Sequence, residues 1–115
     1  MSRLSVMIFD APYGHEKPYT AMRFALTAVN DGHEVTLILF QDGIFVGKKN
    51  QDPAEYPNHL EYLEMAIEEG LNILACGVCC QARGIVKEDL IDGITIVGMH
   101  EIVEACAKSE NTISF

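Results

Sequence analysis

The sequence predicts a three-layer α/β/α fold, in which helices cover both faces of a mostly parallel five-stranded sheet, in a single domain over residues 1–115. Two observations carry this prediction. Short apolar segments that end at turn-forming residues alternate with segments whose apolar residues recur at helical spacing. The length of 115 residues and the apolar content of 49% fit one compact core and argue against disorder.

The first part of the chain predicts a strand-helix-strand unit. Residues 3–9 are mostly apolar and run into the turn-forming segment 10–14, which is typical of a central strand followed by a loop. Pro18 fits the first turn of a helix, and Gly32 fits its C-terminal cap. The apolar stripe of this helix is Tyr19, Met22, Leu26 and Val29. Residues 35–40 then predict the second strand of a right-handed crossover.

The segment from residue 41 to residue 70 predicts a loop and a second long helix. The apolar residues 44–46 are expected to be buried between subunits of an oligomer. Residues 48–57 are polar and contain two prolines, which predicts a mobile surface loop that orders against a partner. A helix over residues 57–69 follows, with Gly70 as its cap. Its apolar stripe is Tyr56, Leu60, Leu63 and Ile67.

The rest of the chain adds three strands and two helices. Strands are expected at residues 71–75, 94–97 and 111–115, the last of them at an edge of the sheet. Residues 78–83 predict a short helix that Gly84 ends, and residues 85–91 are expected to form a loop or a short helix. A last helix has the apolar stripe Met99, Ile102, Val103 and Cys106, which places Cys106 in the core.

Charge and hydropathy exclude several classes of partner. The net charge of −9 disfavours binding to nucleic acid or to an anionic membrane. No apolar run approaches the roughly 18 residues of a membrane span, and residues 1–9 are typical of a first strand rather than of a signal peptide. The protein is therefore expected in the cytoplasm, where its four cysteines would stay reduced. The clustered acidic residues are expected on solvated faces: Glu61, Glu64, Glu68, Glu69, Glu88, Asp89 and Asp92.

Cys76 is the candidate nucleophile, because it directly follows an apolar strand. Open α/β folds keep their active sites at the carboxyl ends of such strands. Gly77 allows a sharp turn into the next helix, whose positive end favours a thiolate at Cys76. The backbone N–H groups of Gly77 and Val78 are candidates to stabilise that anion, and Arg83 follows about two turns later. The alternative is a buried structural cysteine.

Cys79 and Cys80 leave several chemistries open. Cys79 stands three residues after Cys76, a spacing that fits a redox dithiol, although the residues between them are not of the thioredoxin type. A metal clip would need four ligands, and the chain offers no second C-x-x-C and no H-x-x-x-H, so no metal is expected. Either cysteine is also compatible with simple helix packing.

The histidines give no catalytic set. His15 lies in the loop after the first strand, at the sheet edge of Cys76, so it is a possible supporting residue or a solvated loop histidine. His100 shares that edge, whereas His33 lies at the opposite edge and His59 begins a helix. No Ser/His/Asp set, G-x-G-x-x-G sequence or P-loop is present.

Several motifs, in this order and spacing, resemble the DsrE/DsrF-like sulfur-relay family, which includes TusD-type proteins. The resemblance spans nearly the whole chain. Its motifs are Pro12-Tyr13-Gly14, Phe40-Gln41-Asp42-Gly43-Ile44, the cysteine stretch that ends in Ala82-Arg83-Gly84-Ile85, Gly93-Ile94-Thr95-Ile96-Val97-Gly98 and Thr112-Ile113-Ser114-Phe115.

The resemblance implies a small α/β domain that assembles as trimers or hexamers. It also implies a persulfide-carrying cysteine in the members that transfer sulfur, eight residues before the glycine of the Arg-Gly pair. Counted from Gly84, that position is Cys76. Cys79 and Cys80 depart from the single-cysteine pattern of TusD-like carriers, so their role stays open.

These inferences lead to a sulfur-relay protein in which Cys76 accepts a sulfane sulfur and passes it to an acceptor cysteine. Such a carrier needs donor and acceptor proteins but no bound cofactor. One alternative is a non-catalytic oligomeric module that binds a small ligand or a partner segment between residues 10–15, 41–47 and 76–80. Another is a dithiol redox switch formed by Cys76 and Cys79.

Overall fold

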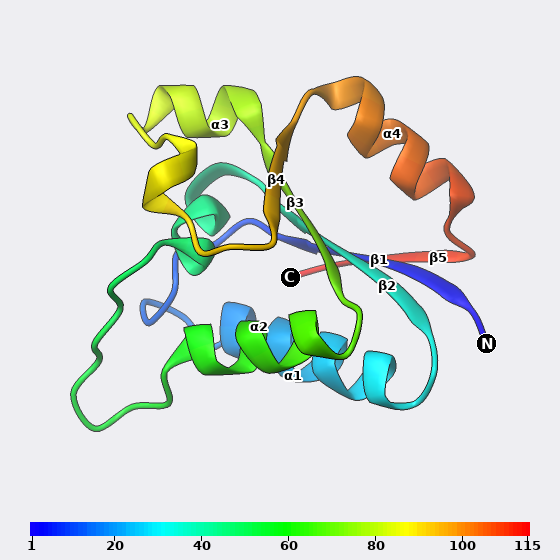
Figure 1. Cartoon of the computed structure of the whole chain (residues 1–115), viewed down its shortest axis with the longest axis horizontal. Helices are drawn as coiled ribbons and strands as arrows, with labels where there is room; N and C mark the ends of the chain where they lie inside the picture. Colours follow the sequence, from blue (N-terminus) through cyan, green and yellow to red (C-terminus); the bar gives the residue numbers. More distant parts are fainter.

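A parallel five-stranded sheet forms the centre of the protein in the computed structural model, which describes all 115 residues (Figure 1). The strands are β1 (Arg3–Ile8), β2 (Glu34–Leu39), β3 (Asn72–Cys76), β4 (Ile94–Val97) and β5 (Asn111–Ser114). Their order across the sheet is β4-β3-β2-β1-β5, and every neighbouring pair is parallel. The predicted α/β fold is confirmed, with a sheet that is entirely parallel rather than mostly so.

Helices cover both faces of this sheet. The helices α1 (Lys17–Asn30) and α2 (His59–Glu68) lie side by side on one face. On the other face lie α3 (Gly77–Ala82) and α4 (Met99–Lys108), separated by β4 in the view of Figure 1. Two short 3₁₀ helices, η1 (Gln41–Gly47) and η2 (Lys87–Asp89), connect the layers. None of the helices is long and apolar enough to cross a membrane.

The core is divided by the sheet into a large and a small part. Because successive side chains of a strand point to opposite faces, Ile73 and Ala75 of β3 face the helices α1 and α2. Leu74 and Cys76 face the other side, where they pack with Ile38 and Ile102 in a second, smaller cluster. Cys76 is thus positioned by the strand register beneath α4.

The helix α4 buries less of its apolar stripe than the sequence suggests. Ile102 is buried, but Met99 and Val103 are 58% and 57% exposed. Cys106 is half-buried and packs against the smaller cluster, so it lies at the margin of the core rather than inside it. The reason is that α4 packs on the sheet without a neighbouring helix to cover its outer side.

Two further expectations are corrected by the structure. Ile44 and Val46 are fully buried in this chain's own core within η1, so they are not available to bury against another subunit. Tyr56 lies before α2, which begins at His59, and its side chain is 41% exposed. The aromatic position of the α2 stripe is therefore lost, while Leu60 and Leu63 are buried as predicted.

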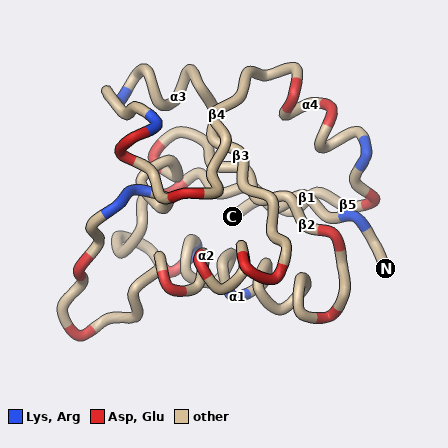
Figure 2. Tube along the Cα trace, in the orientation of Figure 1, with Lys and Arg blue, Asp and Glu red and all other residues tan.

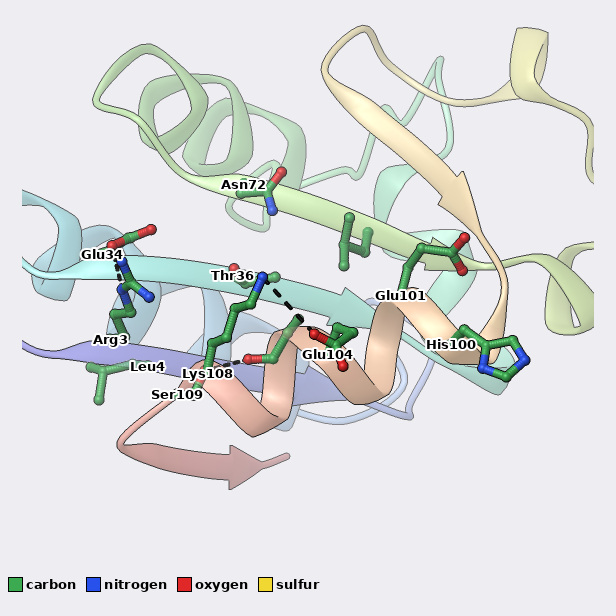
Figure 3. A pocket seen from close by; sticks show the side chains of 12 residues that line it. Arg3, Leu4, Glu34, Thr36, Asn72, His100, Glu101, Glu104, Lys108 and Ser109 are labelled. Carbon is green, nitrogen blue, oxygen red and sulfur yellow. Dashed lines mark hydrogen bonds and ion pairs between the residues drawn. The ribbon is translucent and has the colours of Figure 1, made fainter.

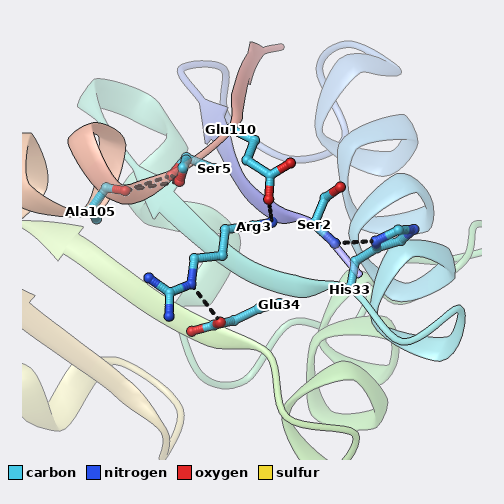
Figure 4. Close-up of polar contacts among 8 residues, drawn as sticks. Ser2, Arg3, Ser5, His33, Glu34, Ala105 and Glu110 are labelled. Carbon is cyan, nitrogen blue, oxygen red and sulfur yellow. Dashed lines mark hydrogen bonds and ion pairs between the residues drawn. The ribbon is translucent and has the colours of Figure 1, made fainter.

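Polar contacts connect β1 to the end of α4 and to the neighbouring strand β2. The buried Ser5 hydroxyl lies 2.6 Å from the Ser109 hydroxyl and donates to the Ala105 carbonyl at 3.4 Å, which ties the end of α4 to β1 (Figure 4). Arg3 pairs with Glu34 at 2.9 Å. Figure 2 shows the other acidic residues spread over α2, α4 and the connecting loops, where the predicted clusters are mostly exposed.

Candidate functional site

Cys76 ends β3 and is the N-cap residue of α3, which is the predicted place for a reactive group at the carboxyl edge of the sheet. Its side chain is 5% exposed and packs against Ile38, Leu74 and Ile102. All four cysteines are free thiols. The thiol of Cys76 is therefore enclosed on its protein side by aliphatic groups.

A groove of about 650 Å³ opens over Cys76, between α3, β4 and the first turn of α4. It does not involve residues 10–15 or 41–47, so the ligand pocket expected between those loops is not the one that Cys76 lines. Val78, 75% exposed, and Met99 lie among its lining residues. The groove is lined by Cys76, Gly77, Val78, Gln81, Thr95, Ile96, Val97, Gly98, Met99 and Glu101.

Glycine at position 77 brings the β3–α3 turn against β4. A Cβ atom on Gly77 would lie 3.1 Å from the Val97 carbonyl oxygen and 3.6 Å from a side-chain carbon of Ile96. The first distance is shorter than an ordinary van der Waals contact. Gly77 therefore lets β4 close the floor of the groove beside Cys76.

The groove carries one carboxylate and no Lys or Arg side chain. Glu101, in the first turn of α4, supplies that carboxylate. Together with the net charge of −9, it disfavours the approach of a free anion. The groove is better suited to an apolar protein segment that carries a sulfur atom to Cys76 without a free negative charge.

Cys79 is the thiol next to Cys76. It is half-buried and touches both core clusters. Burial raises the pKa of Cys79, and the neighbouring Cys76 side chain raises it further, while the Gln41 backbone and the Arg83 charge act in the opposite direction. Cys79 therefore stays protonated above the usual range for a thiol.

Cys80 lies deeper than Cys79, at the next position of the short helix. Its side chain is 2% exposed and belongs to the large core cluster between the sheet, α1 and α2. Burial raises the pKa of Cys80, and the charges of Cys76 and Cys79 raise it further. Packing in the core accounts for its position.

Arg83 anchors the end of α3 rather than lining the groove. Its Nε donates to Oδ1 of Asp42 at 3.0 Å, and its Nη1 donates to the Cys79 carbonyl oxygen at 3.2 Å. The guanidinium thereby connects α3 to η1 and is partly neutralised by the Asp42 carboxylate. Its positive charge still reaches Cys79, where it favours the thiolate.

The histidines lie apart from Cys76. His15 is exposed in the loop after β1 and does not line the groove. The His33 ring accepts a hydrogen bond from the Ser2 backbone N–H at 3.0 Å (Figure 4). His100 lines a second hollow, and His59 is fully buried. No group of three or more His, Cys, Asp or Glu side chains is arranged to hold a metal ion.

The second hollow, of about 420 Å³, lies between α4 and the part of the sheet that α4 leaves open (Figure 3). Its cations are already paired, Arg3 with Glu34 at 2.9 Å and Lys108 with Glu104 at 4.0 Å. Glu101 lines this hollow and the Cys76 groove, so the two meet at the first turn of α4. The hollow is lined by Arg3, Leu4, Glu34, Thr36, Asn72, Leu74, His100, Glu101, Glu104, Ala105, Lys108 and Ser109.

An aromatic cluster around His59 escapes the sequence patterns. The His59 ring is nearly parallel to the rings of Tyr13 and Tyr19, and neither of its nitrogens has a hydrogen-bond partner. Burial lowers the pKa of His59 to about 4. No periodic pattern links these residues, because they come from the loop after β1, the first turn of α1 and the start of α2.

The segment 48–57, expected to be mobile, is anchored beside this cluster. The Gln51 amide donates to the carbonyl oxygens of Val46 at 2.8 Å and Lys48 at 2.9 Å, and it accepts from the Tyr13 hydroxyl at 2.6 Å. Asn58 donates to the Gln51 carbonyl oxygen at 3.0 Å and caps α2. The loop is thus held by its own polar side chains without a partner.

Comparison with known proteins establishes the family. A family model for the DsrE/DsrF-like family matches residues 3–115. The chain is 50% identical over 112 residues to an uncharacterised protein of Methanopyrus kandleri, covering 97% of this chain and 93% of that protein. It is 24% identical over 127 residues to sulfurtransferase TusD of Salmonella newport, covering 98% and 99%. The crystal structure of YchN from Escherichia coli, 26% identical, matches over 100% of both chains with a TM-score of 0.94. As the sequence motifs suggested, the chain belongs to the DsrE/DsrF-like family.

Proposed function

We propose that this protein is a sulfur carrier that holds a persulfide on Cys76 and passes its outer sulfur to a cysteine of an acceptor protein. The observation that carries the proposal is the position of Cys76: a free thiol at the carboxyl end of β3, on the floor of a groove. A sulfur-relay role is also what the family and the name of the relative TusD support.

The chemistry is two successive thiolate attacks on sulfur. The Cys76 thiolate attacks the outer sulfur of a donor persulfide, so that the new Cys76–sulfur bond forms as the donor's sulfur–sulfur bond breaks, and the donor leaves as a thiol after taking up a proton. An acceptor thiolate then attacks the outer sulfur on Cys76 and regenerates the Cys76 thiolate. Neither step needs a bound cofactor.

The groove favours a protein-bound donor over a small anion. Glu101 is its only charged lining residue, and Val78 and Met99 offer apolar contacts. A cysteine on a partner's apolar segment avoids the charge repulsion that an anion such as thiosulfate would meet. Gly77 adds no side chain beside the thiol, and β4 packs directly against its backbone.

We further propose that the carrier is a homo-oligomer, a trimer or a hexamer, and acts in the cytoplasm. The exposed apolar side chain of Val103 on α4, which does not line the groove, supports self-association, because a partner surface would remove it from water. The cytoplasm is proposed because its reducing conditions keep thiols free, and all four cysteines of this chain are free. Light scattering after size-exclusion chromatography measures the oligomeric state, and a monomer would contradict that part of the proposal.

The test is sulfur uptake, measured by intact-protein mass spectrometry after incubation with a protein persulfide donor. The wild-type chain is expected to gain the mass of a sulfur atom, and Cys76→Ser is expected to gain none. Cys106→Ser is the matched control, because Cys106 is a half-buried thiol outside the groove. A folded Cys76→Ser chain that gains as much sulfur as the control would overturn the assignment.

The low exposure of Cys76, 5%, favours a second candidate function. In it the groove holds a small ligand or a partner segment and the thiol performs no chemistry. The rate of alkylation separates the two: a Cys76 that reacts more slowly than a free model thiol near neutral pH, in a chain that takes up no sulfur, supports the binding module.

A further inference from the structure

We propose that Cys79 is a resolving thiol, which converts a persulfide on Cys76 into a Cys76–Cys79 disulfide and releases hydrosulfide. The inference rests on the proposed function, since it starts from the loaded Cys76. The loaded protein would then have two possible reactions. It passes its sulfur to an acceptor when one is present, and it releases the sulfur as hydrosulfide when none is.

The placement of the two thiols carries this proposal. Cys76 is the N-cap residue of α3, and Cys79 follows three residues later in the same turn, a spacing that puts side chains on the same face of a helix. Cys79 packs against the small cluster that contains Cys76, and its thiol lies beside the Cys76 side chain. Cys80, the next residue along, is packed in the large cluster instead, and its side chain is only 2% exposed.

The step balances without an outside oxidant. The Cys79 thiolate attacks the inner sulfur of the persulfide, the Sγ atom of Cys76, and forms the Cys79–Cys76 sulfur–sulfur bond. The bond between Cys76 Sγ and the outer sulfur breaks, and the outer sulfur leaves with the electron pair as hydrosulfide. The two protein thiols are oxidised to a disulfide and the sulfane sulfur is reduced to sulfide. A dithiol reductant then returns the protein to its starting state.

Relay and discharge start from the same persulfide but at different sulfur atoms. An acceptor thiolate attacks the outer sulfur and takes it, whereas Cys79 attacks the inner sulfur and expels it. Burial raises the pKa of Cys79, so only a small share of it is thiolate near neutral pH. Protonation of Cys79 therefore slows discharge relative to attack by an ionised acceptor thiol, and discharge accelerates as the pH rises.

The experiment follows the loaded protein in the absence of an acceptor. The wild-type chain, Cys79→Ser and Cys80→Ser are loaded with a cysteine persulfide, freed of excess donor and incubated. Hydrosulfide and the intact mass without reductant are then recorded. Wild type and Cys80→Ser are expected to release hydrosulfide, lose the added sulfur and two further hydrogens, and give a Cys76–Cys79 crosslinked peptide. Cys79→Ser is expected to keep its persulfide and to lose this release.

The outcomes separate this step from the carrier function. Release by Cys79→Ser as fast as by wild type, or a crosslink from Cys76 to Cys80 instead, overturns the role of Cys79 while leaving Cys76 as a carrier. A wild-type chain that takes up no sulfur on Cys76 contradicts the carrier function itself, and this step falls with it. A rise of the wild-type release rate with pH, absent from Cys79→Ser, is the signature of the thiol that attacks.

Discussion

The rings of Tyr13 and His59 are stacked, with centroids 4.3 Å apart and an angle of 20° between their planes. Tyr19 lies nearly parallel to the same imidazole, at 5.7 Å and 16°. His59 has no exposed surface and no hydrogen-bond partner for either ring nitrogen. This part of the core, between α1 and α2, therefore holds a neutral imidazole that packs as an aromatic ring.

Acidification is expected to destabilise the protein through His59. Its pKa is lowered to about 4 by burial, against about 6.5 in the unfolded chain. Between these values the unfolded state binds the extra proton, so stability is complete above pH ~6.5 and falls as the pH drops towards ~4, by about 3 kcal/mol. Chemical denaturation at a series of pH values measures this loss.

His59→Phe is the control for this prediction, because phenylalanine keeps the ring and removes the proton-binding site. We expect the free energy of unfolding of His59→Phe to change less than that of wild type between pH ~6.5 and ~4. An equal fall in both proteins would show that other groups cause the acid sensitivity.

Removal of the Gln51 side chain is expected to loosen the loop that covers this cluster. Gln51→Ala would leave the carbonyl oxygens of Val46 and Lys48 and the Tyr13 hydroxyl without their partner. The expected cost is about 1–3 kcal/mol, together with faster proteolytic cleavage within residues 48–58. Gln81→Ala, at an exposed helical position, is the matched control and is expected to change neither quantity. Unchanged cleavage in Gln51→Ala would show that Gln51 does not anchor the loop.

Glycine at position 43 is expected to be essential for the turn that follows β2. A Cβ atom there would overlap the carbonyl oxygen of Ile8, which is backbone and cannot move aside as a side chain would. Gly43→Ala is expected to lower the free energy of unfolding by about 1–3 kcal/mol. Gly14→Ala, where a Cβ meets no atom within 4 Å, is the comparison and is expected to lose much less. Equal losses would contradict the close approach.

The charge of Glu101 is expected to decide which reagents reach Cys76. In Glu101→Gln, iodoacetate, an anion, should alkylate Cys76 faster relative to neutral iodoacetamide than it does in wild type. Glu104→Gln is the matched control, because Glu104 lines the second hollow but not the groove. The ratio of the two alkylation rates is measured by peptide mass spectrometry at low salt. A ratio that rises equally in both variants would point to net charge rather than to the groove.

Arg83 is expected to tune the resolving thiol. Its charge opposes the effect of burial on the pKa of Cys79, so Arg83→Gln should raise that pKa further and move the pH dependence of hydrosulfide release to higher pH. Asp42→Asn is expected to shift it in the other direction, because it frees the guanidinium of its carboxylate partner. Identical pH profiles in the three proteins would remove Arg83 from the account.

The order of strands and helices and the position of Cys76 could be predicted from the sequence, because buried parallel strands are short apolar runs that end at turns. The same pattern misled at Ile44 and Val46. Apolar residues between glycines looked like an intersubunit surface, and they are buried by a 3₁₀ helix of the chain itself. Helical periodicity predicted that Met99 and Val103 lie on the apolar stripe of the last helix. It could not predict that the sheet leaves more than half of each side chain exposed.

The aromatic cluster around His59 and the surroundings of the thiols could not be predicted, because both depend on contacts between distant segments. Tyr13 and His59 are 46 residues apart, and the contact between them follows no repeat. The carboxylate in the Cys76 groove comes from α4, 25 positions beyond the cysteine, and of the segments named from the sequence only 76–80 contributes to the lining. The pairing of Arg83 with Asp42 likewise joins two motifs that are far apart in the sequence, and nothing in either motif indicates that they are in contact.

The most direct test of the central claim is to locate the transferred sulfur atom. A donor protein carrying an isotopically labelled persulfide is mixed with the wild-type chain, free thiols are blocked, and the peptide that contains Cys76, Cys79 and Cys80 is fragmented in the mass spectrometer. The label is expected on Cys76 and is expected to pass to an acceptor cysteine when one is added. A label found only on another cysteine, or none on a chain whose donor remains loaded, would contradict it.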